Sequence, residues 1–86
     1  MNRAIIPAML KGSRDALLKR LQPISIHGQL SYDVHYVFAD DANEEVHVAR
    51  VGPEAIAPGL SAGDLARLDF LVGVVTAVNR PTPASH

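Results

Sequence analysis

Residues 24–38 read ISIHGQLSYDVHYVF, and apolar side chains occupy almost every second position of this stretch. The apolar positions are Ile24, Ile26, Leu30, Tyr32, Val34, Tyr36 and Phe38. Because successive side chains of a strand point to opposite faces, this period predicts a strand with one apolar and one polar face. Gly28 interrupts the alternation, which fits either a bulge that bends one long strand or the turn of a small hairpin. We favour the bent strand, since small barrels need such bends, and predict one strand over residues 24–38.

The residues that follow predict a second strand paired with the first. Turn-forming residues occupy 40–45 in the sequence DDANEE, and the alternation resumes over residues 45–51. An antiparallel register that sets Phe38 opposite Glu44 places aromatic and valine side chains together on the inner face. A slip of one residue would exchange the two faces, so this register is our prediction.

The segment SRDALLKRLQP at residues 13–23 has the features of a short helix. Ser13 is a suitable N-cap, and Asp15 lies in the first turn, where the helix dipole favours an acid. Basic residues follow in the last turn, and Pro23 ends the segment. The sequence therefore predicts a helix over residues 14–21.

Residues 64–79 fit two interpretations. Ser61 as a cap, followed by spaced leucines and valines, would begin a helix. The many valines, together with a central Gly73, favour a strand instead, and we predict a strand over this range. Residues 71–78 are apolar on both faces, so such a strand needs cover on both sides, from another element or a second subunit.

These elements predict one domain of the α+β class that is rich in β structure. An N-terminal helix would precede a small antiparallel sheet or barrel of long, bent strands within residues 1–80. Over residues 24–80 the pattern of strands interrupted by glycine resembles an OB or SH3 barrel in outline. The proline-rich residues 81–86 are expected to form a disordered tail.

The chain carries few groups suited to chemistry. It has 86 residues and no cysteine, which excludes disulfides and thiolate metal sites. No serine lies in a nucleophile motif, so we predict no enzyme activity and no cofactor. In the register above His35 and His47 face each other, and Asp33 lies on the same face. These three residues form a candidate divalent-metal site, one of our two alternative functions.

Charge is distributed unevenly along the chain, which indicates a binding function. Residues 1–22 contain five basic residues and one acidic residue, whereas residues 23–86 contain eight acidic and three basic residues. We therefore expect a protein-binding or self-associating module, and a homo-oligomer or an unknown protein as its partner. The candidate interface consists of Leu71, Val72, Val74 and Val75 as its apolar part and Arg14, Lys19 and Arg20 as its charged part.

Nucleic acid is the other alternative partner, bound through the basic N-terminal helix. Binders of this kind stack bases on exposed aromatic side chains in a basic groove. Here the predicted strands are net acidic, and their aromatic side chains fall on the inward faces. Both features disfavour nucleic acid.

The sequence predicts a soluble protein of the cytoplasm. No apolar run approaches the roughly 20 residues of a membrane span. The apolar residues 4–10 are followed by Lys11 and Arg14, where a signal peptide would need small residues. We therefore expect neither a membrane partner nor export.

Overall fold

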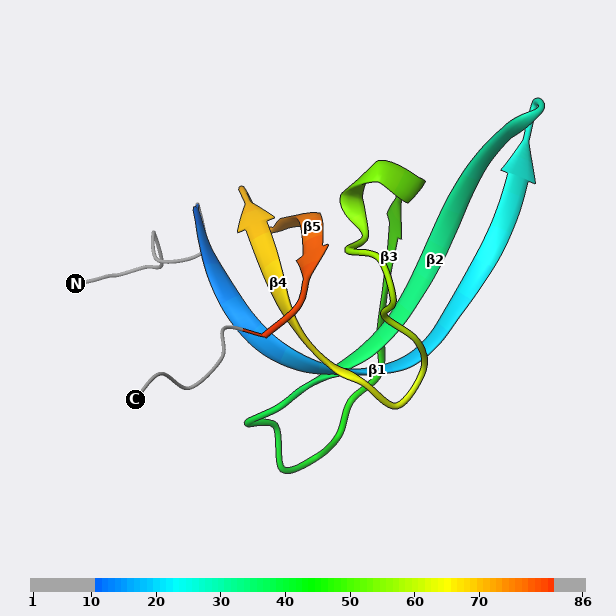
Figure 1. Ribbon diagram of the computed structural model, residues 1–86. Coiled ribbons are helices and arrows are strands. Elements are labelled where there is room, and N and C mark those ends of the chain that lie inside the picture. Colours follow the sequence, from blue (N-terminus) through cyan, green and yellow to red (C-terminus); the bar gives the residue numbers. More distant parts are fainter. Residues whose placement is uncertain (1–10, 82–86) are drawn as a thin grey trace.

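The computed structural model describes residues 11–81, which form one sheet of five antiparallel strands (Figure 1). The elements are β1 (Lys11–Ile26), β2 (Gln29–Phe38), β3 (His47–Val51), the 3₁₀ turn η2 (Pro53–Ala55), β4 (Leu65–Leu71) and β5 (Val74–Asn79). Their order across the sheet is β3-β2-β1-β4-β5, so β1 lies at the centre. The tail predicted at residues 81–86 lies, apart from Pro81, outside the described residues.

The predicted helix at residues 14–21 is wrong, because this segment belongs to β1. Ala16 and Leu18 are fully buried, while their neighbours in sequence are not. β1 pairs with β2 on one side and with β4 on the other, and these two sets of ladder hydrogen bonds outweigh the local capping signals. The fold is therefore almost entirely β rather than α+β. Residues 11–81 contain no helix long and apolar enough to cross a membrane.

The stretch 24–38 forms a hairpin rather than one bent strand. Ile26 of β1 pairs with Gln29 of β2, and only His27 and Gly28 lie between them. Their φ angles are 52° and 77°, and positive values at both central residues define the turn that suits the twist of a hairpin. Gly28 is therefore the turn of a hairpin, the alternative that we did not favour. This β1–β2 hairpin projects from the rest of the sheet (Figure 1).

Residues 64–79 are extended, as predicted, but they form two strands rather than one. Leu71 pairs with Val74, and the turn between β4 and β5 consists of Val72 and Gly73. Their φ angles, 52° and 77°, repeat the geometry of the first hairpin. The two long strands predicted over residues 24–38 and 64–79 thus each contain a hairpin turn, with Gly28 and Gly73 at the second turn position.

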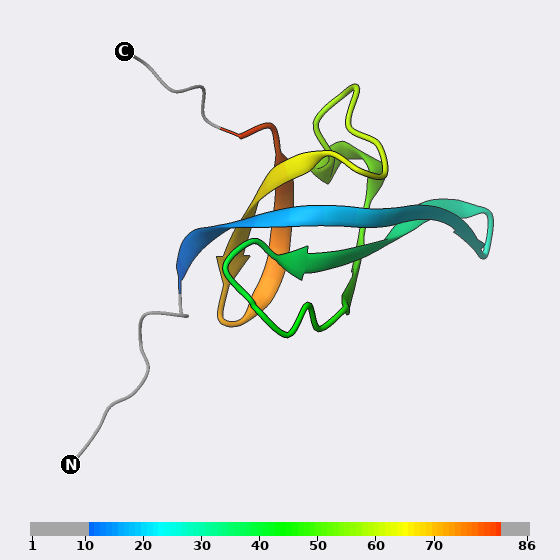
Figure 2. The same cartoon turned by 90° about the horizontal axis from the view of Figure 1, so that it is seen from below.

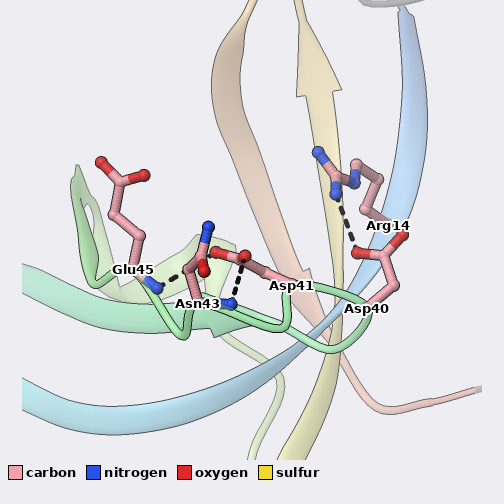
Figure 3. Close-up of polar contacts among 5 residues, drawn as sticks. All are labelled: Arg14, Asp40, Asp41, Asn43 and Glu45. Atoms are coloured by element: carbon pink, nitrogen blue, oxygen red, sulfur yellow. Dashed lines mark hydrogen bonds and ion pairs between the residues drawn. The ribbon is translucent and has the colours of Figure 1, made fainter.

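The predicted register between β2 and β3 is wrong by one residue. Tyr36 pairs with His47, and Tyr32 pairs with Val51. The loop before β3 explains the shift, because the Asp41 carboxylate accepts the backbone N–H groups of Asn43 and Glu45 at 2.9 and 3.0 Å (Figure 3). This compact loop sets where β3 begins, at His47, and the length of a connection decides the register of the strands that it joins.

The sheet curls until its two edge strands, β3 and β5, approach each other, as Figures 1 and 2 show. Ile56, just after η2, forms a parallel bridge with Val78 of β5, and the Ala57 N–H donates to the Val78 carbonyl at 2.8 Å. The five strands therefore form a small, strongly curled and barrel-like antiparallel sheet. The buried core cluster comprises Ala16, Leu18, Val34, Tyr36, Val51, Ala66, Leu68, Phe70, Val75 and Val78.

Candidate interaction surface

The outer face of the sheet carries apolar side chains where it crosses the middle of β1. Leu17 pairs with Val37 of β2 on one side and with Leu65 of β4 on the other. Paired residues share a face of the sheet, and Leu17 points away from the core because its neighbour Leu18 points into it. Figure 2 looks at the molecule from below, where the middle of β1 crosses in front of β4.

The same face continues onto the start of β3. Tyr36 pairs with His47 on the inner face, and Val46, which directly precedes β3, is 53% exposed; if the register continued by one residue, Val46 would lie beside Val37 on the outer face. Val48 lies on that face as well, opposite His35. We call this set of five residues the outer row; its members are Leu17, Val37, Val46, Val48 and Leu65.

Three members of the outer row, Leu65, Leu17 and Val37, are direct neighbours across three strands. The exposed members of the row range from 37% for Leu17 to 55% for Val48, whereas Val37 at its centre is only 5% exposed. Val37 is nevertheless absent from the buried core cluster. A shallow hollow of about 160 Å³ lies over it, with Leu17, Lys19 and Glu44 in its lining. Val37 is therefore a buried residue on the outer face of the sheet, where its pair Leu17 also lies.

Charged and hydrogen-bonded side chains lie on the outer face on either side of the row. Arg50 makes two hydrogen bonds to the Asp33 carboxylate at 2.8 and 3.1 Å, and Arg67 contacts Asp15 at 3.0 Å. Further along β1, the Ser13 hydroxyl donates to an Asp69 carboxylate oxygen at 2.7 Å. The outer row thus lies between these ionic and hydrogen-bonded side chains, and further apolar side chains, Ile26 and Leu71, occupy the ends of the same face.

The groups with shifted pKa values all have structural causes. The hydrogen bonds from Arg50 hold the pKa of Asp33 below its usual range, and contact with Asp33 raises the pKa of Arg50. The backbone N–H groups of Glu45 and Asn43 lower the pKa of Asp41, and burial raises the pKa of Tyr36. Hydrogen bonding to a charged group and burial account for these shifts.

The structure separates the residues of the predicted interface. Leu71, Val72 and Val74 are exposed at the end of the β4–β5 hairpin, but Val75 is 7% exposed and belongs to the core. Their place in the sheet is beside Lys11, at the start of β1. The apolar part of the predicted interface is therefore reduced to three side chains around a turn.

The predicted basic residues lie elsewhere along β1. The guanidinium of Arg14 lies over the Phe38 ring, 3.5 Å from its centroid, and contacts Asp40 at 3.0 Å (Figure 3). Lys19 and Arg20 are exposed at an irregularity of β1, which follows the position of Leu17 in the outer row. The structure thus places Lys19 and Arg20 beside the outer row and not beside the β4–β5 turn.

The residues of the predicted metal site do not come together. His47 stacks on the inner-face side chain of Tyr36, with ring centroids 5.4 Å apart, whereas His35 pairs with Val48 on the outer face. Asp33 is held by Arg50. Within residues 11–81, no group of three histidine or carboxylate side chains is placed to hold a metal ion.

The aromatic side chains face the interior. Tyr36 and Phe70 are buried in the core, and Tyr32 and Phe38 pack against it. These are all the tyrosines and phenylalanines of the chain, and it has no tryptophan. The platform of exposed aromatic rings on which single-stranded nucleic acid stacks is therefore not formed by them.

Comparisons with known proteins identify no relative. No family model matches the chain, and neither the curated proteins nor the solved structures include a significant match. Arguments about function therefore depend on the surface itself.

Proposed function

We propose that the protein is a small, non-enzymatic protein-binding module whose contact surface is the outer row. The observation that carries this proposal is that Leu17, Val48 and Leu65 expose apolar surface on one face of the sheet, around the buried Val37. Contiguous apolar surface with a polar surround is typical of sites that bind other proteins. The row is aliphatic, which suits a protein surface better than a base or a sugar.

The distribution of polar groups supports a binding role rather than catalysis. Among residues 11–81 no polar or charged side chain is buried. Catalytic acids and bases usually lie in clefts that shift their pKa values. The shifted groups here, Asp33, Asp41, Arg50 and Tyr36, are explained by ion pairing, loop hydrogen bonds and core packing. The proposal therefore assigns no reaction and no cofactor.

The size of the outer row favours a reversible contact. Complete burial of an exposed valine or leucine contributes about 1.5–3 kcal/mol. Four members of the row are between 37% and 55% exposed, so each adds about 1 kcal/mol when a partner covers it. Association itself costs about 4–15 kcal/mol. We therefore expect a weak complex that needs further contacts at its rim.

Site-specific crosslinking tests this proposal without knowledge of the partner. A photoreactive amino acid replaces Val48 in one variant and the exposed Thr76 of β5, outside the row, in a control. The experiment is performed in intact cells, in whose cytoplasm we expect the protein. Illumination should join position 48, but not position 76, to a protein, which a gel reveals as a band of higher mass.

The crosslinking results at positions 48 and 76 also include outcomes that would contradict the proposal. If position 48 yields no protein adduct, or if both positions yield the same adducts, then the outer row is not a contact surface. A distinct adduct at position 48 supports the proposal whether the captured protein is another chain or a second copy of this one.

A further inference from the structure

Unpaired charges of opposite sign flank the outer row. Lys19 and Arg20 of β1 form what we call the basic flank, and Glu44 and Glu45, just before Val46, form the acidic flank. All four side chains are exposed, and none of them is in an ion pair within residues 11–81. These four charges are therefore available to a partner.

The sheet register places the two flanks toward opposite sides of the row. From the Leu17–Val37 pair, β1 runs onward to Arg20, which pairs with His35. In the other direction β2 continues to Phe38 and the loop that carries Glu44. The unpaired charges on one long side of the row are thus basic, and those on the other side are acidic.

We infer that the partner of the outer row is a second copy of this chain, related by a two-fold axis that runs along the row; this inference rests on the proposed function. Such an axis places the apolar row of each copy against that of the other. It also exchanges the two long sides, so the basic flank of one copy faces the acidic flank of the other. A two-fold interface must be self-complementary in this way.

The charge pattern selects this arrangement over other face-to-face pairings. An axis perpendicular to the row would place the two basic flanks together, and like charges across an interface oppose association. With the axis along the row, each dimer gains two contacts between opposite flanks. These contacts supply the rim interactions that the small apolar row needs.

Charge reversal tests the inference with two variants. The first carries Lys19→Glu and Arg20→Glu, and the second carries Glu44→Lys and Glu45→Lys. Each variant alone brings like charges together and should raise the dimer dissociation constant at least about tenfold. An equimolar mixture restores opposite charges on both sides of the interface. It should form a mixed dimer with an affinity close to that of the unchanged chain.

Sedimentation equilibrium of the full chain measures these affinities, with circular dichroism to compare the folds. Val48→Lys, within the row, should also abolish the dimer, whereas Val72→Asn at the β4–β5 turn should leave it intact. Recovery of the dimer in the mixture shows that both charge variants are folded.

Three results would overturn the inference. They are a wild-type chain that is monomeric up to about 0.5 mM, charge variants that dimerise like wild type, and a mixture that stays monomeric. None of them removes the proposed function, which fails if position 48 captures no protein, or only the adducts that position 76 also captures, in the crosslinking experiment. Failure of the two-fold pairing and failure of protein binding are therefore distinguishable.

Discussion

The outer row and the β4–β5 turn both expose aliphatic side chains, but they differ in what surrounds those side chains. The row draws Leu17, Val37 and Leu65 from three strands, and charges of both signs flank it. The turn exposes Leu71, Val72 and Val74 from one short piece of chain. Because apolar residues from separate strands form a broader surface than a single turn, we propose the outer row rather than the turn as the contact surface.

The largest expected effect comes from charge placed next to the turn. Val75→Asp puts a carboxylate into the core and should destabilise the fold by at least about 3 kcal/mol. Val74→Asp changes the preceding residue, which is 62% exposed, and should leave the protein folded. Urea denaturation followed by circular dichroism measures both. If Val75→Asp were as stable as Val74→Asp, the inward orientation of Val75 would be incorrect.

A second pair of variants compares the two faces of β1 at the outer row. Leu18 is fully buried, so Leu18→Ala should cost about 2–5 kcal/mol of unfolding free energy. Leu17→Ala removes the same atoms from a side chain that is 37% exposed and should cost less than about 1.5 kcal/mol. Equal losses in denaturant titrations would mean that Leu17 belongs to the core rather than to the row.

The extended structure of residues 29–38 was predictable because its alternation is local and regular. The strand at residues 11–26 was missed, since Ser13, Asp15 and Pro23 match helix signals and only pairing with β2 and β4 decides otherwise. The two glycine turns were ambiguous for a related reason. A glycine fits a bend or a reversal equally well until the pairing of the flanking residues is known.

Two errors in the sequence interpretation, the helix over residues 14–21 and the shifted register of residues 45–51, concealed the outer row. A helix places Leu17 and Leu18 on one apolar stripe, whereas the strand sends them to opposite faces. The register shifted by one residue turned Val48 inward, although it pairs with His35 on the outer face. A period of two along β1, with buried Ala16 and Leu18 as its inner members, was the signal that could have revealed Leu17 as an outward side chain.

A smaller effect is expected from relief of strain at the β4–β5 turn. Val72 has a φ of 52°, which is unfavourable for a β-branched residue, whereas asparagine is preferred at this turn position. Val72→Asn should therefore raise the unfolding free energy by about 0.5–1 kcal/mol. His27→Asn is the matched change in the other hairpin and should have less effect, because histidine tolerates this conformation better. Destabilisation by Val72→Asn in thermal melts would contradict the assigned turn geometry.

The smallest expected effect is the dependence of the protein's stability on pH, through the carboxylates of Asp33 and Asp41. Asp33 and Asp41 have pKa values below their usual range in the folded protein, so they contribute stability at pH values above that range. This contribution should disappear as the pH falls below about 4 and through the folded pKa values, with a falling melting temperature. Carboxyl ¹³C NMR titration should show both midpoints below those of unstructured peptides. In Asp33→Asn the melting temperature should depend less on pH over this range, because one of the two carboxylates is gone. An unchanged dependence would mean that the Arg50 contact does not hold Asp33 in solution.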